Sequence, residues 1–216
     1  MTYNKELFIV AIKKSLQNAE ELISEAKILK EHNCIPRAYT LNQLGIEEIG
    51  KASMIHNFLL FEDFKNPKSQ KEFLKKIINH TEKTDSSIQM DLVFAIVIKN
   101  KEIQQSLIKS ITNQRQILKE LNHNKNNALY VSFIDSNVYL PSEIINEKML
   151  ENIEFIASIR ISVAKQYFEI ILKEFDETLK RIKREPIREI EKKAEKMLDR
   201  HFKNQKTSII KHTHEK

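Results

Sequence analysis

The sequence is poor in the residues that break helices and in those that cross-link small folds. Its 216 residues include two glycines, four prolines, one cysteine and no tryptophan. So few helix breakers, together with abundant Lys, Glu, Leu and Ile, favour an all-α protein. The single cysteine, Cys34, excludes an intramolecular disulfide and a cysteine-rich zinc site, and it fits a reducing, cytoplasmic setting.

Long apolar runs and the usual cofactor motifs are also lacking. No stretch approaches the roughly 18 apolar residues of a membrane span, and the N-terminus does not show the basic-then-apolar order of a signal peptide. We therefore expect a cytoplasmic protein with no membrane partner. Neither a Gly-rich phosphate loop nor a His-Glu-x-x-His metal pattern occurs, and Glu-x-x-His occurs once, at Glu120–His123, rather than as the pair of motifs used in di-iron bundles. The residues thus predict no metal and no other cofactor.

Positive charge is concentrated near the C-terminus. The chain carries a net charge of +6, and residues 176–216 hold 13 Lys or Arg against 8 Asp or Glu, which leaves five of those charges in this segment. One interpretation is that the segment binds a polyanion such as RNA. The other is a solvated helix of mixed charge, because acidic and basic residues alternate there.

Apolar residues recur at helical spacing along most of the chain. Asn33 is expected to end the first helix, and Ser142 is expected to cap the last one, which Pro186 interrupts. Only the segment near 128–140, rich in β-branched and aromatic residues, favours extended structure. The predicted helices span 4–31, 36–61, 70–83, 86–122 (one helix or a broken pair), 142–179 and the charged segment 187–203.

These elements predict an all-α helical bundle with one short extended or hairpin segment near 128–140 and long C-terminal helices. We expect a single helical domain over 1–205 and a frayed tail at 206–216. Within the domain, a core of about 4–122 precedes an insert at 123–141 and C-terminal helices at 142–205.

Both glycines of the chain, Gly45 and Gly50, lie in the second predicted helix. Each costs about 1 kcal/mol relative to alanine in a helix interior, so their presence predicts close approach of a neighbouring helix. Glu47 and Lys51 are four residues apart, in the favourable order for a side-chain pair. The charged residues of this helix fit either a structural ion-pair network or a catalytic site.

Five sequence pieces, in the same order, resemble the AbiV-type abortive infection proteins of bacteria. The likeness covers about 15–145. The pieces are Asn18-Ala19-x-x-Leu22-x-x-x-Ala26, Arg37-Ala38-x-x-Leu41, Glu47-Glu48-x-Gly50-Lys51-Ala52, His80-x-x-Lys83, and Leu129-Tyr130-Val131 with Asp135 and Pro141.

The resemblance implies a member of the HEPN superfamily, whose proteins are compact helical bundles, often homodimers, and in many cases metal-independent ribonucleases. It implies an antiphage defence protein that halts host growth or translation on infection, with a phage protein as its trigger. The usual HEPN signature, an Arg followed after four to six residues by a His, is not present. Arg37 and Arg160 have no His at that distance, and Arg200 directly precedes His201.

A site assembled in space remains the candidate for catalysis, with Arg37, Glu48, Lys51 and His80 as its residues. His80 would act as general acid or base, and Arg37 and Lys51 would stabilise a phosphorane-like transition state. The 2′-hydroxyl of RNA would be the nucleophile, so no metal would be needed. Structural alternatives are a capping role for His80 and a buried, hydrogen-bonded amide for Asn18. The candidate polar network comprises Asn18, Glu47, Lys83, Tyr130 and Asp135.

Two functions that need no catalysis stay open. The first is a helical binding module that captures a phage protein or part of the translation machinery. The second is a purely structural helical adaptor. Exposed apolar surface on the long helices predicts that the chain forms a homodimer in either case.

Overall fold

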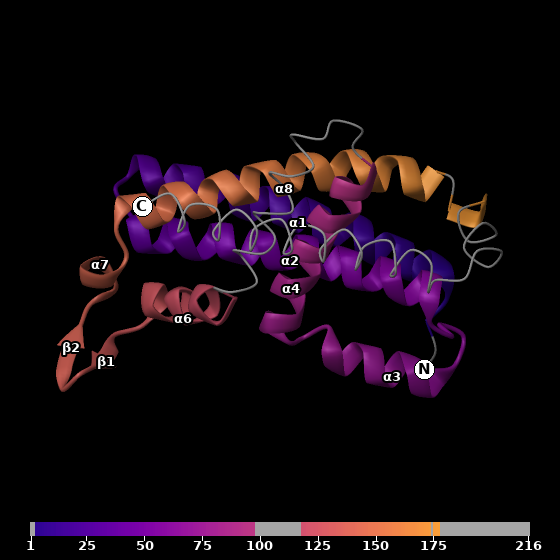
Figure 1. The fold of residues 1–216 in the computed structure, drawn as a ribbon, viewed down its shortest axis with the longest axis horizontal. Helices are drawn as coiled ribbons and strands as arrows, with labels where there is room; N and C mark the ends of the chain where they lie inside the picture. The colour runs from indigo at the N-terminus through magenta and orange to yellow at the C-terminus, as the bar shows by residue number, and fades with distance from the viewer. Residues whose placement is uncertain (1–2, 98–117, 174, 178–216) are drawn as a thin grey trace, which may run out of the picture.

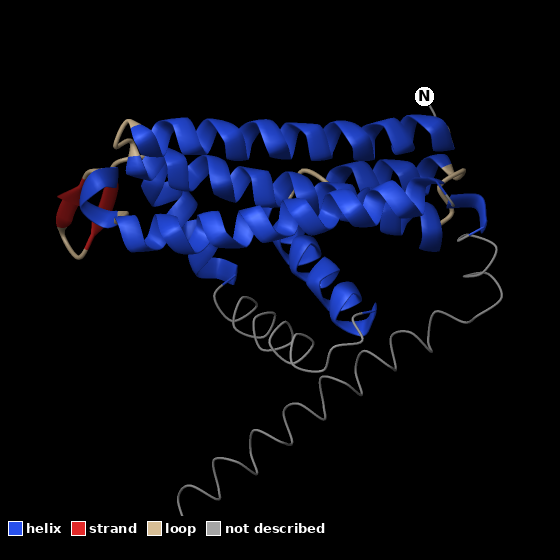
Figure 2. Ribbon diagram, turned by 90° about the horizontal axis from the view of Figure 1, so that it is seen from above, coloured by secondary structure: helices blue, strands red, loops and turns tan. Residues whose placement is uncertain are grey.

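Three long helices run side by side and form the body of the molecule (Figure 2). The computed structural model describes residues 3–97, 118–173 and 175–177. The long helices are α1 (Lys5–Glu31), α2 (Ile35–Phe61) and α8 (Glu147–Lys173), and the shorter elements lie along one side and at one end of them (Figure 1). The predicted all-α bundle with a short hairpin is therefore confirmed.

The first two helices begin and end close to the predicted positions. The Asn4 side chain caps α1 by accepting a hydrogen bond of 2.9 Å from the backbone N–H of Leu7. Asn33 adopts a left-handed conformation with φ of 58°, which ends α1 as its residue type suggests. Pro36 then occupies the first turn of α2, where its missing N–H costs no helical hydrogen bond.

The helix predicted over 70–83 is in fact divided between two elements. α3 (Pro67–Lys76) ends early, and α4 (His80–Val97) begins three residues before the predicted end. Asn79 causes the break, because its side chain accepts hydrogen bonds from the backbone N–H groups of Thr81 and Glu82. Most of the helix predicted over 86–122 lies outside the described residues.

A helix, a hairpin and one further helical turn follow. They are α6 (Leu118–Leu129), the antiparallel strands β1 (Ser132–Ile134) and β2 (Asn137–Tyr139), and α7 (Pro141–Ile144). The extended segment is confirmed, but it starts after residue 131. Residues 123–129, predicted to belong to an insert, instead continue α6.

The last long helix starts at Glu147 rather than at Ser142, so the predicted Ser142 cap is wrong. α7 ends after one turn, and the Asn146 side chain accepts a hydrogen bond of 3.0 Å from Met149 N–H to start α8. The predicted interruption at Pro186, the segment 187–203 and the tail lie outside the described residues. No helix in the described part of the chain is long and apolar enough to cross a membrane.

Both glycines of α2 lie where another helix comes close, as predicted. A Cβ atom at Gly45 would lie 2.8 Å from Ile23 Cγ1 of α1 and 3.3 Å from the Ala19 carbonyl oxygen. A Cβ atom at Gly50 would lie 1.7 Å from the carbonyl oxygen of Lys83 in α4. No side chain fits at that distance, so Gly50 allows the backbone of α4 to rest directly on α2.

The apolar core forms two clusters along the bundle. One contains Phe8, Ile49, Phe58 and Phe168, and the other contains residues such as Ile46, Leu121, Leu150 and Ile153. α2 contributes to both clusters.

Candidate functional site

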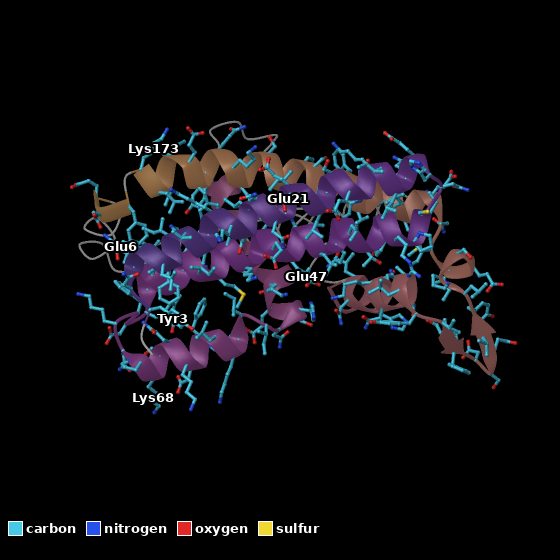
Figure 3. The ribbon with its side chains drawn as sticks, turned by 180° about the vertical axis from the view of Figure 1, so that it is seen from behind. Tyr3, Glu6, Glu21, Glu47, Lys68 and Lys173 are labelled. Carbon is cyan, nitrogen blue, oxygen red and sulfur yellow. The ribbon has the colours of Figure 1, made fainter. Side chains whose placement is uncertain are left out.

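The most unusual residue of the core is Glu47, whose side chain is 1% exposed. Along α2 it lies between Ile46 of one apolar cluster and Ile49 of the other. Figure 3 shows it near the middle of the molecule. A carboxylate loses several kcal/mol of hydration on burial, so it persists there only with charged or hydrogen-bonding partners.

Two buried lysines supply most of that compensation. Lys125 Nζ of α6 lies 2.7 Å from Glu47 Oε1, and Lys83 Nζ of α4 lies 3.3 Å from Glu47 Oε2. Both lysine side chains are at most 10% exposed. Two ammonium groups therefore share one carboxylate, which leaves an excess of positive charge among these three side chains.

His80 connects this buried group to the surface. Its Nδ1 lies 2.5 Å from Glu47 Oε2, while its side chain is 54% exposed. A carboxylate at this position accepts the Nδ1 proton and so fixes the tautomer and the ring orientation of a histidine. Nε2 then has a free lone pair, which can take a proton from a group that approaches from solvent.

The positions of these side chains follow from local sequence. His80 and Lys83 are three residues apart in the first turn of α4, so they lie on the same face of that helix. The contact at Gly50 and the cap at Asn79 together place this first turn against α2. The site therefore depends on the close backbone contact at Gly50 of α2 and on the cap at Asn79 before α4, as well as on the charged side chains.

A seam of buried polar side chains extends the group along α4. Gln43 Nε2 donates to Thr84 Oγ1 at 3.3 Å, and the Ser87 hydroxyl donates to the Thr84 carbonyl oxygen at 2.7 Å. Arg160 of α8, also buried, donates from Nη1 to Ser87 Oγ at 2.9 Å. The polar seam thus links α2, α4 and α8.

The predicted Glu47–Lys51 pair does not form, and that prediction is wrong. Glu47 points into the interior, so Lys51 pairs instead with Glu48, with Nζ 3.2 Å from both carboxylate oxygens. This second pair is partly exposed and lies apart from the contacts made by Glu47.

Arg37 does not contact His80. Its Nη1 donates to the carbonyl oxygens of Ala128 and Leu129, each at 3.0 Å, and so caps the C-terminus of α6. Of the four residues predicted for catalysis, the structure joins Glu48 to Lys51 and places Arg37 and His80 in separate contacts.

The predicted polar network is brought together only in part. Glu47 and Lys83 meet, as described above. Asn18 is exposed on α1, so the buried amide considered for it is absent, and Tyr130 and Asp135 are exposed around the hairpin.

Lys125 was missed by the sequence-based prediction. Residues 123–141 were predicted to form an insert that begins in an Asn-rich segment, whereas Leu121, Lys125 and Ala128 recur at helical spacing and are all buried. That spacing was the available signal, because it places a lysine on an apolar face.

No three His, Cys, Asp or Glu side chains of the described segments gather in a way that would hold a metal ion. The chemistry supported by the described side chains is proton transfer at His80 next to fixed positive charge.

Comparisons with known proteins give one family. A family model, HEPN_AbiV, described as AbiV, matches residues 8–162. No curated protein and no solved structure is significantly similar to the chain.

Proposed function

Because the chain belongs to the AbiV family, we propose that it is an abortive-infection defence protein that halts host growth or translation by metal-independent cleavage of RNA. Family membership supports the defence role. The half-exposed His80, oriented by the buried Glu47 and backed by Lys83 and Lys125, is the observation that supports RNA cleavage.

In the proposed reaction, His80 Nε2 takes the proton of a ribose 2′-hydroxyl. The 2′-oxygen attacks the adjacent phosphorus, the bond from phosphorus to the 5′-oxygen breaks, and His80 returns the proton to that leaving oxygen. The products are a 2′,3′-cyclic phosphate and a 5′-hydroxyl. The positive potential of the two lysines favours the extra negative charge of the transition state. A catalytic role for Arg37, Glu48 and Lys51 stays a prediction. Their hydrogen bonds are made to the end of α6 or to each other rather than to His80.

The first test is RNA cleavage by purified protein in the presence of EDTA. We expect His80→Ala to lower the cleavage rate by about a hundredfold or more, as is typical on removal of a general acid–base group. His123→Ala is the matched control, because His123 is exposed on α6 and makes no contact with Glu47. The control should cleave at the rate of the unmodified protein.

Equal cleavage by the His80 variant and the unmodified protein would refute the catalytic assignment. Intact RNA after incubation with a preparation that arrests growth in cells would refute RNA cleavage altogether. Circular dichroism of each variant shows whether a lost activity reflects lost folding.

A second candidate function is a non-catalytic binding module that captures a phage protein or part of the translation machinery. It is favoured by large apolar side chains exposed at the hairpin, among them Phe133 at 83%. Self-association also remains part of the proposal. Exposed apolar residues on α8, such as Phe155 and Ile170, support a homodimer.

A further inference from the structure

α6 contacts the candidate site and leads directly into the hairpin. Lys125, near its middle, binds Glu47, while its last residues are capped by Arg37. Tyr39 of α2 shares a hydrogen bond with Asn124, and burial raises the pKa of this tyrosine to about 12. β1 begins three residues after α6 ends. The hairpin therefore follows directly on a helix that carries one of the site's charges.

The hairpin has one partly buried face and one exposed, apolar face. Phe133 and Val138 are cross-strand partners, so they lie on the same face, and they are 83% and 58% exposed. Val131, just before β1, and Leu140, just after β2, each lie two residues from one of these partners and are also exposed, which places them on the same face by the two-residue period. We call these four side chains the hairpin face.

Charge identifies the class of partner that fits the hairpin face. Residues 126–147 contain no Lys, Arg or His and three acidic residues, Asp135, Glu143 and Glu147, in a chain with 36 Lys or Arg. An uncharged to acidic surface repels RNA and anionic membranes and attracts a basic partner. The hairpin face of a second copy would bring the same acidic residues against these ones, which argues against self-docking of this face.

We propose that the hairpin face is the docking site for a protein that presents an apolar segment flanked by basic residues, and that docking controls the His80–Glu47 pair through α6. This inference rests on the proposed function of the site. The hairpin stands at the end of the bundle beside α6 and α7 (Figure 1), so a partner can reach it without displacing the long helices. Coupling of this kind needs a continuous path of contacts, and α6 provides one.

The test compares two double variants in cells challenged with phage. Phe133→Ser with Val138→Ser removes two of the four side chains of the hairpin face, and Phe61→Ser with Leu74→Ser removes two exposed apolar side chains of α2 and α3 as the control. We expect the hairpin variant to lose protection by about tenfold, within the range of typical coupling between sites. The control should protect as the unmodified protein does. Basal RNA cleavage in vitro should be unchanged in both.

Full protection by the hairpin variant, or equal loss in both variants, would overturn the inference. The proposed function is tested separately by RNA cleavage in vitro. If the unmodified protein shows no cleavage that depends on His80, the proposed function fails. The hairpin variant is expected to keep that cleavage.

A charge test distinguishes the class of partner. Asn137→Lys with Ser142→Lys adds positive charge beside the hairpin face, and the corresponding glutamine pair is its control. A basic partner predicts weaker protection by the lysine variant than by the glutamine variant. Equal or stronger protection would overturn the assignment, and a gain would indicate RNA or an anionic membrane as the occupant.

Discussion

The buried carboxylate of Glu47 is the shared partner of two lysines and a histidine. Its charge therefore contributes more to the free energy of unfolding than the charge of any one of those partners. Replacing it by glutamine preserves its shape but leaves the ammonium groups of Lys83 and Lys125 buried without a counter-ion. Removal of one partner of a buried ion pair typically costs about 3–5 kcal/mol. We expect Glu47→Gln to lower the free energy of unfolding by that amount.

Urea denaturation followed by circular dichroism measures this loss. Glu48→Gln is the matched control, since within the described residues Glu48 pairs with the partly exposed Lys51, and it should cost less than about 1 kcal/mol. Similar losses in the two variants would contradict the interpretation of Glu47 as the central charge. The loss for Lys125→Met should lie between the losses for Glu47→Gln and Glu48→Gln, because Lys83 and His80 still contact the carboxylate.

At the scale of the elements, the packing of α4 on α2 depends on the missing Cβ of Gly50. In Gly50→Ala the new methyl group would overlap the Lys83 carbonyl oxygen, and a backbone atom cannot move aside as a side chain does. We expect a loss of about 3 kcal/mol or more in the free energy of unfolding, at the upper end of overpacking effects. His80 and Lys83 would move away from Glu47 with the shifted helix.

Gly45→Ala makes the same change where the nearest atom, Ile23 Cγ1, belongs to a side chain. The gain in helix propensity, about 1 kcal/mol, then offsets much of the crowding, so the net change should stay within about 1 kcal/mol. Thermal and urea unfolding of both variants give the comparison. A Gly50 variant as stable as the Gly45 variant would show that the close contact between α2 and α4 does not limit stability.

The two long N-terminal helices and the packing glycines were predictable because local signals, such as the turn at Asn33 and the two glycines of α2, agree with the tertiary structure. The break at Asn79 was not predicted, because apolar spacing continues across it and only the cap separates α3 from α4. The partners of Glu47 were beyond sequence analysis for a different reason. Lys83 and Lys125 lie 36 and 78 residues from it, and only the folded chain brings them together.

At the scale of the whole molecule, the contact between α2 and α8 includes a buried histidine that makes folding sensitive to acid. His56 is 4% exposed, its ring meets Tyr167, Phe168 and Phe175 edge-on, and its Nε2 has no hydrogen-bond partner in the described part of the chain. Burial lowers the pKa of His56 from 6.5 to about 4. The folded protein therefore holds this ring neutral between pH 6.5 and 4, where the unfolded chain protonates it.

Because the unfolded state binds the extra proton, the stabilisation that comes from keeping His56 neutral is fully present above about pH 7. It is lost as the pH falls toward 4. The loss from this one group is about 3 kcal/mol, since each pKa unit corresponds to 1.36 kcal/mol. His56→Leu removes the titrating ring and keeps an apolar side chain of similar size. The free energy of unfolding of each protein is measured by urea titration at pH 7.5 and at pH 4. Between these pH values the unmodified protein should lose about 3 kcal/mol more than the variant does. All other ionisable groups are the same in both proteins and largely cancel in this difference. A difference that is the same at both pH values would therefore show that His56 does not carry the acid sensitivity.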